Sequence, residues 1–103
     1  MRNLEPQDVA ATVAAGGLKL LDVRTAEELE LARLPLAQHI PMDQIPARLA
    51  ELNPGAPIAV LCHHGGRSMQ VARFLERNGF TDVINVAGGI DAWSAIDPSV
   101  PRY

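Results

Sequence analysis

The residues best suited to chemistry lie together in the stretch LCHHGGRSMQVARFL, which contains the only cysteine of the chain. Cys62 is followed directly by two histidines, two glycines and Arg67. Three interpretations are open for this cysteine. It is a metal ligand together with His63 and His64, a nucleophile in an anion-binding loop, or an ordinary buried thiol, which is a common fate of a free cysteine.

The composition of the loop favours the nucleophile. Four residues separate Cys62 from Arg67, and two of them, Gly65 and Gly66, permit unusual backbone angles. Ser68 is a preferred N-cap residue and predicts that a helix begins there. Such a loop turns backbone N–H groups inward above a helix N-terminus. This cradle would stabilise a thiolate at neutral pH and any anionic group attached to its sulfur, as covalent catalysis requires.

Two other interpretations depend on the histidines. A zinc site would need His63, His64 and the cysteine to converge, but three adjacent side chains rarely reach one ion, and no CxxC or spaced HxxxH completes a site. We therefore expect no metal. A thiol-protease mechanism would need an oriented histidine base, for which His39 is the only distant candidate, and nothing around it marks that role. We place His39 at the surface or a strand edge, and the other two histidines at the pocket mouth.

Three further charged residues have roles near the loop. A cation in the first turn opposes the helix dipole, so we expect Arg67 to order the loop or stabilise its anion. Asp22 and Arg24 follow another apolar strand, and we interpret them as a turn-stabilising ion pair. From a neighbouring strand end such a pair can brace the cysteine loop without touching substrate.

Apolar runs alternate with amphipathic stretches along the chain, which predicts alternating strands and helices. Right-handed crossovers then give a parallel sheet covered on both faces, with ligands outside the carboxyl ends of the strands. Trp93 is assigned to the core. A capping box at Thr25 and Glu28 marks one helix start. The expected strands are 18–23, 37–41, 57–62 and 82–86, and the expected helices are 6–15, 26–32, 42–52, 68–77 and 90–96.

Length and composition limit the function classes. A chain of 103 residues fits a single domain, 1–103, with residues 97–103 as a tail. The net charge of −3 and the single lysine disfavour nucleic acid as a partner. No apolar run is long enough to span a membrane and no signal peptide is recognisable, so we expect a cytoplasmic location. With one cysteine, no second thiol of this chain can resolve an intermediate.

Four motifs, in order, resemble the rhodanese (sulfurtransferase) family in its single-domain form. LLDVRTAEEL is similar to the first signature of the family, and HIPM to the end of the second. CHHGGRS is similar to its active loop, and VAGGIDAW to its closing motif. The resemblance runs over nearly the whole chain. It implies an α/β fold with a parallel five-stranded sheet and helices on both faces.

The resemblance also implies an activity. Cys62 would accept a sulfane sulfur as a persulfide, and a thiophilic acceptor would then take that sulfur. The cradle would consist of the residues from His63 to Ser68, supported by Asp22 and Arg24. The donor would be thiosulfate or a persulfide, and the acceptor cyanide, a thiol or a sulfur-carrier protein, to which the DPSVPRY tail also points. No metal or organic cofactor is implied.

Two alternative functions remain open. In the first alternative the domain is a non-catalytic interaction or sulfur-relay module. In the second it is a small phosphatase. The related cell-cycle phosphatases have a loop that is one residue longer and surrounds a phosphate-sized oxyanion, whereas the shorter loop here suits a single sulfur atom. Glu27, Glu28 and Glu30 make the segment after Arg24 acidic, which argues against thiosulfate as the physiological donor.

Overall fold

The computed structural model describes residues 1–103 and contains one parallel sheet. Every pair of neighbouring strands runs parallel, and the strand order is β1-β5-β4-β2-β3. The fold class predicted from the sequence is therefore confirmed. The strands are β1 (Arg2–Leu4), β2 (Lys19–Asp22), β3 (Gln38–His39), β4 (Ile58–Leu61) and β5 (Val83–Val86).

The register of the central strands positions the functional residues. Strands β4 and β5 are buried along their whole length, as their continuous apolar sequences predict for a sheet covered on both faces. Asp22 at the end of β2 lies opposite Leu61 at the end of β4. The Val23 N–H donates to the Leu61 carbonyl, which extends this ladder. Asp22 and Cys62 thus emerge at the same edge of the sheet.

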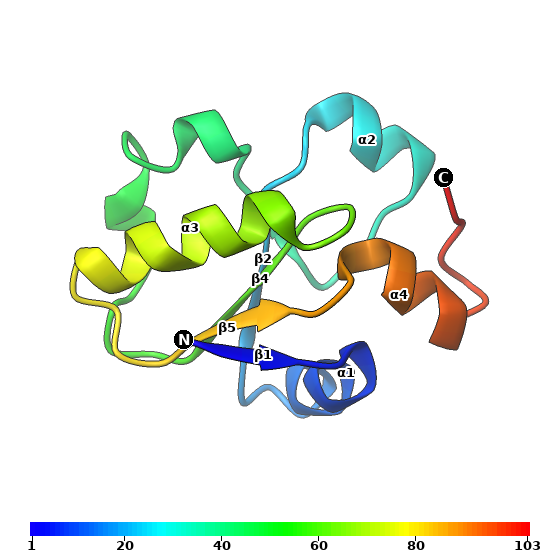
Figure 1. Ribbon diagram of the computed structural model, residues 1–103, viewed down its shortest axis with the longest axis horizontal. Helices are drawn as coiled ribbons and strands as arrows, with labels where there is room; N and C mark the ends of the chain where they lie inside the picture. Colours follow the sequence, from blue (N-terminus) through cyan, green and yellow to red (C-terminus); the bar gives the residue numbers. More distant parts are fainter.

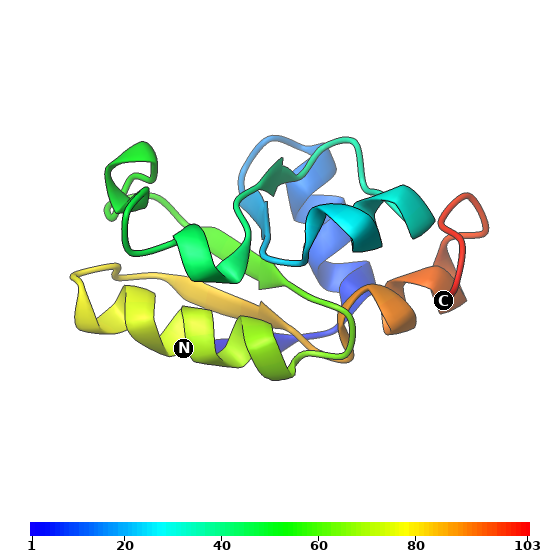
Figure 2. The same cartoon turned by 90° about the horizontal axis from the view of Figure 1, so that it is seen from above.

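Four α-helices cover the sheet, and they divide between its two faces (Figures 1 and 2). On one face Val71 and Leu75 of α3 pack into the first hydrophobic core. On the other face Val9 of α1 and Trp93 of α4 pack into the second, which confirms the placement of the tryptophan. None of these helices has the length and apolar content needed to cross a membrane. The helices are α1 (Pro6–Ala14), α2 (Ala26–Leu31), α3 (Gly66–Arg77) and α4 (Gly89–Ile96).

The capping box predicted for α2 is present. The Thr25 hydroxyl accepts a hydrogen bond from the Glu28 N–H, and the Glu28 carboxylate accepts one from the Thr25 N–H. These contacts satisfy N–H groups that a helix start leaves free. They also fix the direction of the Glu28 side chain, which reaches the cysteine loop.

The prediction of a helix over residues 42–52 is wrong. Two short 3-10 turns, Met42–Gln44 and Leu49–Glu51, stand in its place. Pro46 lies between them, and a proline has no N–H to continue a helical ladder. Ile45 and Leu52 nevertheless reach the core, so the apolar spacing located the buried side chains without identifying the backbone.

Two further differences concern element boundaries. Strand β1 was not predicted, because three largely exposed residues at a sheet edge carry no periodic signal. The start of α3 was placed too late. Gly65 is the N-cap, and Ser68 lies inside the first turn of the helix, where its hydroxyl oxygen is 3.1 Å from the Gly65 carbonyl oxygen. Ser68 is therefore not the cap, since a left-handed glycine already ends the loop.

Candidate active site

The candidate nucleophile lies at the end of a buried strand. Cys62 follows β4 directly and its side chain is buried. The Gly65 N–H donates a hydrogen bond to the Cys62 Sγ over 3.0 Å. Gly65 has a φ of 107°, which residues other than glycine rarely adopt. The loop thus turns back on the sulfur at the residue where α3 begins.

A buried hydroxyl provides the second polar contact of the sulfur. The Ser68 Oγ lies 3.3 Å from the Cys62 Sγ, and 2.5 Å from the Asn85 Oδ1. A hydroxyl carries one proton, so Ser68 can donate to only one acceptor at a time. While it donates to Asn85, it can accept from the Cys62 thiol, and after rotation it can donate to a thiolate. Ser68 can therefore serve both protonation states of the sulfur.

The start of α4 holds the loop from the opposite side. The Ile90 N–H donates to the Cys62 carbonyl over 2.8 Å, and the Asp91 N–H donates to the His63 carbonyl over 3.0 Å. In a trans peptide the C=O and N–H point in opposite directions. The peptide N–H groups that follow these two carbonyls therefore point away from α4. Only the Gly65 N–H contacts the sulfur directly, so the cradle expected from the sequence stays a prediction.

Asp22 and Arg24 form the expected pair in the turn after β2. The Arg24 Nη2 lies 2.7 Å from the Asp22 Oδ2, and both side chains are almost fully buried. Burial by itself would lower the pKa of Arg24, but the hydrogen bonds to Asp22 and Tyr103 raise it overall. His39 lies at the edge strand β3, and its Nε2 donates to the Arg24 carbonyl over 2.7 Å. The pair therefore shapes this turn from within the protein.

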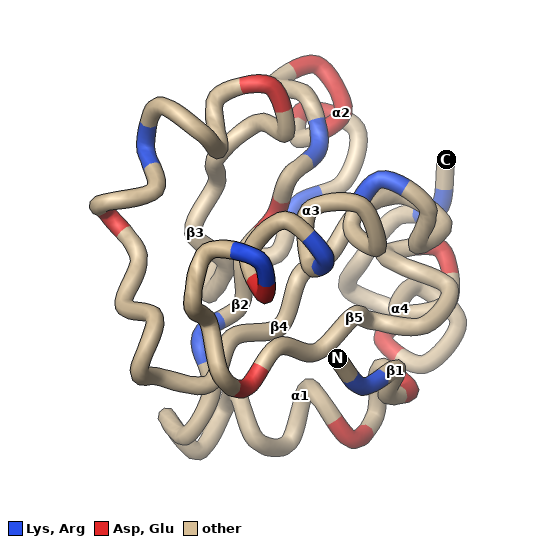
Figure 3. The backbone as a smooth tube through the Cα atoms, turned by 60° about the vertical axis from the view of Figure 1, so that its left-hand side comes forward, with Lys and Arg blue, Asp and Glu red and all other residues tan.

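Arg67 is held by α2 rather than directed at the sulfur. Its guanidinium forms two hydrogen bonds with the Glu28 carboxylate, of 2.5 and 2.9 Å. This bidentate geometry fixes orientation as well as charge. Glu28 projects from α2, the helix on which acidic residues gather (Figure 3). The expected role of Arg67, which is to order the loop or stabilise its anion, stays a prediction.

The last residue of the described chain completes this network. The Tyr103 hydroxyl donates to the Glu28 Oε2 over 2.6 Å and accepts from the Arg24 Nη1 over 3.0 Å. The C-terminus accordingly lies close to α2 in Figure 1. Burial and the hydrogen bond to Glu28 raise the pKa of Tyr103 to about 12. Polar contacts thus run continuously from the Asp22–Arg24 pair to Arg67.

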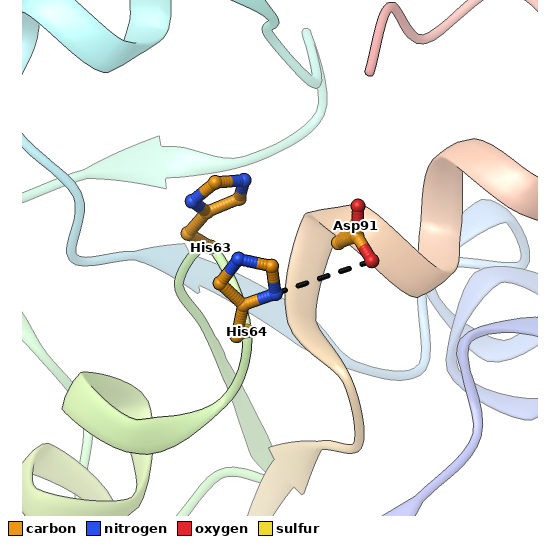
Figure 4. A group of neighbouring side chains, drawn as sticks. All are labelled: His63, His64 and Asp91. Carbon is orange, nitrogen blue, oxygen red and sulfur yellow. Dashed lines mark ion pairs between the residues drawn. The ribbon is translucent and has the colours of Figure 1, made fainter. Parts of the chain in front are cut away.

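The two histidines of the loop have different surroundings. The His63 ring stacks on the Tyr103 ring, with centroids 3.9 Å apart and planes 9° apart. The His63 Nε2 lies 2.8 Å from the Tyr103 carbonyl. His64 is exposed and faces Asp91 of α4 (Figure 4). Neither histidine lines a cavity of the structure, so their expected position at the pocket mouth stays a prediction.

A cavity of about 430 Å³ opens beside the loop and includes Arg67 in its wall. A second cavity of about 250 Å³ adjoins it through the shared residues Met42 and Pro46. Cys62 lines neither. The remaining wall of the first cavity consists of Val23, Thr25, Pro41 and Asp43.

The model of the Rhodanese-like domain family matches residues 5–96. The chain belongs to the rhodanese family. This rhodanese domain is 32% identical over 93 residues to a protein named Thiosulfate sulfurtransferase GlpE from Pseudomonas savastanoi pv. phaseolicola. The match covers 90% of this chain and 88% of that protein. The family assignment made from the four sequence motifs is confirmed.

Other relatives carry the rhodanese domain in larger proteins. An Arabidopsis thaliana protein named Rhodanese-like/PpiC domain-containing protein 12, chloroplastic, is 46% identical over 90 residues, which is 82% of this chain and 30% of that protein. The present chain therefore spans about a third of the length of that relative. A solved Rhodanese-like domain protein from Staphylococcus aureus is 33% identical, with a TM-score of 0.86 and coverage of 100% of this chain and 99% of that one.

The sequence analysis did not assign three residues of the rhodanese domain to the candidate site, although the structure places them there. Glu28 was recognised as a capping residue and as part of an acidic segment, and Tyr103 only as part of a tail, because contacts across 39 and 75 residues leave no periodic signal. Asn85 could have been found from the sequence. It is the one polar residue in the otherwise apolar strand VINV, and a buried amide there requires partners.

The charge of Glu28 makes the stability of the rhodanese domain dependent on pH. The ion pair with Arg67, aided by the Tyr103 hydroxyl, lowers the pKa of Glu28 to about 2 from a usual value of 4.5. A lowered carboxyl pKa stabilises the fold above the unfolded value, and this contribution is lost as the pH falls from about 4.5 to 2. We expect Glu28→Gln to reduce the acid-dependent part of the unfolding free energy in this window.

The measurement is urea denaturation at a series of pH values. Glu30→Gln on the same helix is the control, since Glu30 is exposed. The expectation is wrong if wild type and Glu28→Gln lose stability equally between pH 4.5 and 2.

Proposed function

We propose that this protein is a sulfurtransferase that carries a sulfane sulfur on Cys62. The observation that supports this most directly is the contact of the Cys62 Sγ with the Gly65 N–H and the Ser68 hydroxyl at the start of α3. Hydrogen-bond donors aimed at a sulfur favour its anionic form and an anionic terminal sulfur attached to it. The sulfurtransferase name of the Pseudomonas relative supports the same reaction class.

The proposed reaction has two balanced steps. The Cys62 thiolate attacks the outer sulfur of a sulfane donor, which forms a new S–S bond while the bond within the donor breaks and the remaining anion leaves. With thiosulfate as donor, sulfite is the leaving group. An acceptor such as cyanide then attacks the outer sulfur of the Cys62 persulfide. The S–S bond breaks, thiocyanate leaves, and the thiolate is regenerated.

Each neighbouring residue has a distinct role in the proposal. Cys62 is the catalytic residue, and the backbone from His63 to Gly66 forms the cradle. Arg67 and Ser68 are positioning residues, because one is bound to Glu28 and the other to Asn85. Asp22 and Arg24 support the turn beside the loop. No step requires a metal ion or an organic cofactor.

The choice of donor follows from the charge around the site. Arg67, the cation nearest to the loop in sequence, is already neutralised by Glu28, and α2 adds further acidic side chains. A dianion such as thiosulfate gains little attraction from these surroundings. A persulfide donor and a protein or thiol acceptor fit them better, with residues 1–103 acting as a single domain.

Intact-mass measurement tests the proposal. After incubation with thiosulfate or a low-molecular-weight persulfide, we expect a gain equal to one sulfur atom, and we expect cyanide to remove that gain with release of thiocyanate. A protein that acquires no sulfur from either donor would be a binding module instead. Turnover of an aryl phosphate that depends on Cys62 would favour the phosphatase.

A further inference from the structure

A buried amide from a neighbouring strand reaches the cysteine loop. Asn85 is the third residue of β5, opposite Val60 of β4 and Asn3 of β1, and β5 lies between these two strands (Figure 1). Side chains two residues apart in a strand share a face of the sheet, so Asn85 points to the side of Val83, where α3 packs. Asn85 is only 2% exposed. A polar side chain in this position requires hydrogen-bond partners.

The orientation of the Asn85 amide follows from a backbone acceptor. The Asn85 Nδ2 lies 3.4 Å from the Gly65 carbonyl oxygen and 3.0 Å from the Asn3 Oδ1. A carbonyl oxygen only accepts hydrogen bonds, so the amide nitrogen must be the atom that faces Gly65. The Asn85 Oδ1 then faces Ser68 and lies 2.5 Å from its Oγ. An amide oxygen also only accepts, so the Ser68 hydroxyl is the donor in this short contact.

Ser68 has one hydroxyl proton and three acceptors within reach. Its Oγ lies 2.5 Å from the Asn85 Oδ1, 3.1 Å from the Gly65 carbonyl oxygen and 3.3 Å from the Cys62 Sγ. Since the shortest contact takes the proton, the Ser68 oxygen presents lone pairs to the sulfur. This arrangement suits a thiol, which can donate its proton to Ser68. It does not suit a thiolate, which needs a donor.

A thiolate on Cys62 therefore gains the Ser68 proton only if the hydroxyl turns away from Asn85. The Asn85 Oδ1 then loses the one hydrogen bond that it accepts, inside a buried site. A buried acceptor without a partner costs more free energy than a typical hydrogen bond contributes. Asn85 consequently favours the states in which the Cys62 Sγ carries no charge, which are the thiol and the inner sulfur of a persulfide.

We propose that Asn85 is a positioning residue for sulfur transfer, which holds the Ser68 proton away from Cys62 except when its sulfur is a thiolate. This inference rests on the proposed function. When an acceptor attacks the outer sulfur of the persulfide, the S–S bond breaks and its electron pair stays on the Cys62 Sγ, to which Ser68 then donates. When the thiolate attacks the next donor, that electron pair forms the new S–S bond, and Ser68 turns back to Asn85.

Charged groups near the loop also affect the thiolate, and none of them is altered in the test. Arg67 is the one whose charge interacts with that of Cys62, and it is bound to Glu28. Strands β4 and β5 contribute no charged side chain. The other titratable groups on the elements around the loop are His63 and His64, the Asp22–Arg24 pair after β2, and Asp91 of α4.

Ultraviolet absorbance of the thiolate as a function of pH tests the proposal, with the spectrum of Cys62→Ser subtracted. Cys62 is the only cysteine, so the signal reports this sulfur alone. Asn85→Ala removes the competing acceptor, and the midpoint of thiolate formation should fall by at least about half a pH unit. Asn85→Val should act in the same direction, and it fills the space with a residue favoured in strands. A cooperative thermal transition shows that each variant is folded.

Asn3→Ala is the matched control. It removes an exposed partner of the same amide, but the Gly65 carbonyl still orients Asn85 toward Ser68. Its midpoint should stay within about 0.2 pH unit of the wild type.

A double variant separates this role from a merely structural one. In a Ser68→Ala protein no hydroxyl proton is left to redirect, so adding Asn85→Ala should move the midpoint by less than about 0.2 pH unit. The proposal is overturned if neither Asn85 variant lowers the midpoint, or if the full shift persists without Ser68. Because no sulfur donor is present, these outcomes are independent of the mass measurement that tests sulfur transfer itself.

Discussion

Cys62→Ser is expected to reduce cyanide-dependent thiocyanate formation by at least about a thousandfold, to the rate of the reaction without protein. A serine hydroxyl is a poor nucleophile toward sulfur at neutral pH and forms no persulfide. No other thiol of the chain can replace the lost one. The measurement is thiocyanate release from thiosulfate or a persulfide donor together with cyanide.

The folded state of the variant must be checked at the same time. Serine is slightly smaller than cysteine, and its hydroxyl can accept the Gly65 N–H that now contacts the sulfur. We therefore expect a cooperative thermal transition close to that of the wild type. A folded Cys62→Ser protein that retains a tenth or more of the activity would contradict the proposed role of Cys62.

Gly89→Ala is expected to lower sulfur transfer by about ten- to a hundredfold, through the position of the loop rather than through its chemistry. Gly89 has a φ of 61°, and a Cβ would lie 2.4 Å from the His63 carbonyl oxygen and 2.5 Å from that of Cys62. These backbone atoms cannot rotate away as a side chain can. The loop must shift, and the contact between the Gly65 N–H and the Cys62 Sγ shifts with it.

Gly16→Ala separates this steric effect from backbone strain. Gly16 also has a positive φ, of 81°, but a Cβ there would meet nothing within 4 Å. Both variants should lose about 1–2 kcal/mol of unfolding free energy from the left-handed backbone. Only Gly89→Ala should also lose turnover when rates are compared at equal amounts of folded protein. Equal rates for the two variants would show that the close packing of α4 on the loop does not control the reaction.

The sequence by itself determined the elements that depend on local patterns. The apolar run before Cys62 predicts a buried strand, the Thr25–Glu28 spacing predicts a capped helix, and both are confirmed. These signals are local because strand burial and helix capping involve residues only a few positions apart. The four ordered motifs then identified the family, and with it the parallel sheet.

Only the tertiary structure decided which residues surround the loop. Tyr103 reaches Glu28 across 75 positions, and Arg67 reaches Glu28 across 39. Asp91 faces His64 because the N–H groups at the start of α4 donate to the loop carbonyls. Even the Ser68 hydroxyl has a different role from the expected cap, since a left-handed glycine ends the loop before it. Such contacts arise when separate elements pack on one edge of the sheet, and the spacing of residues along a chain does not encode which elements will meet there.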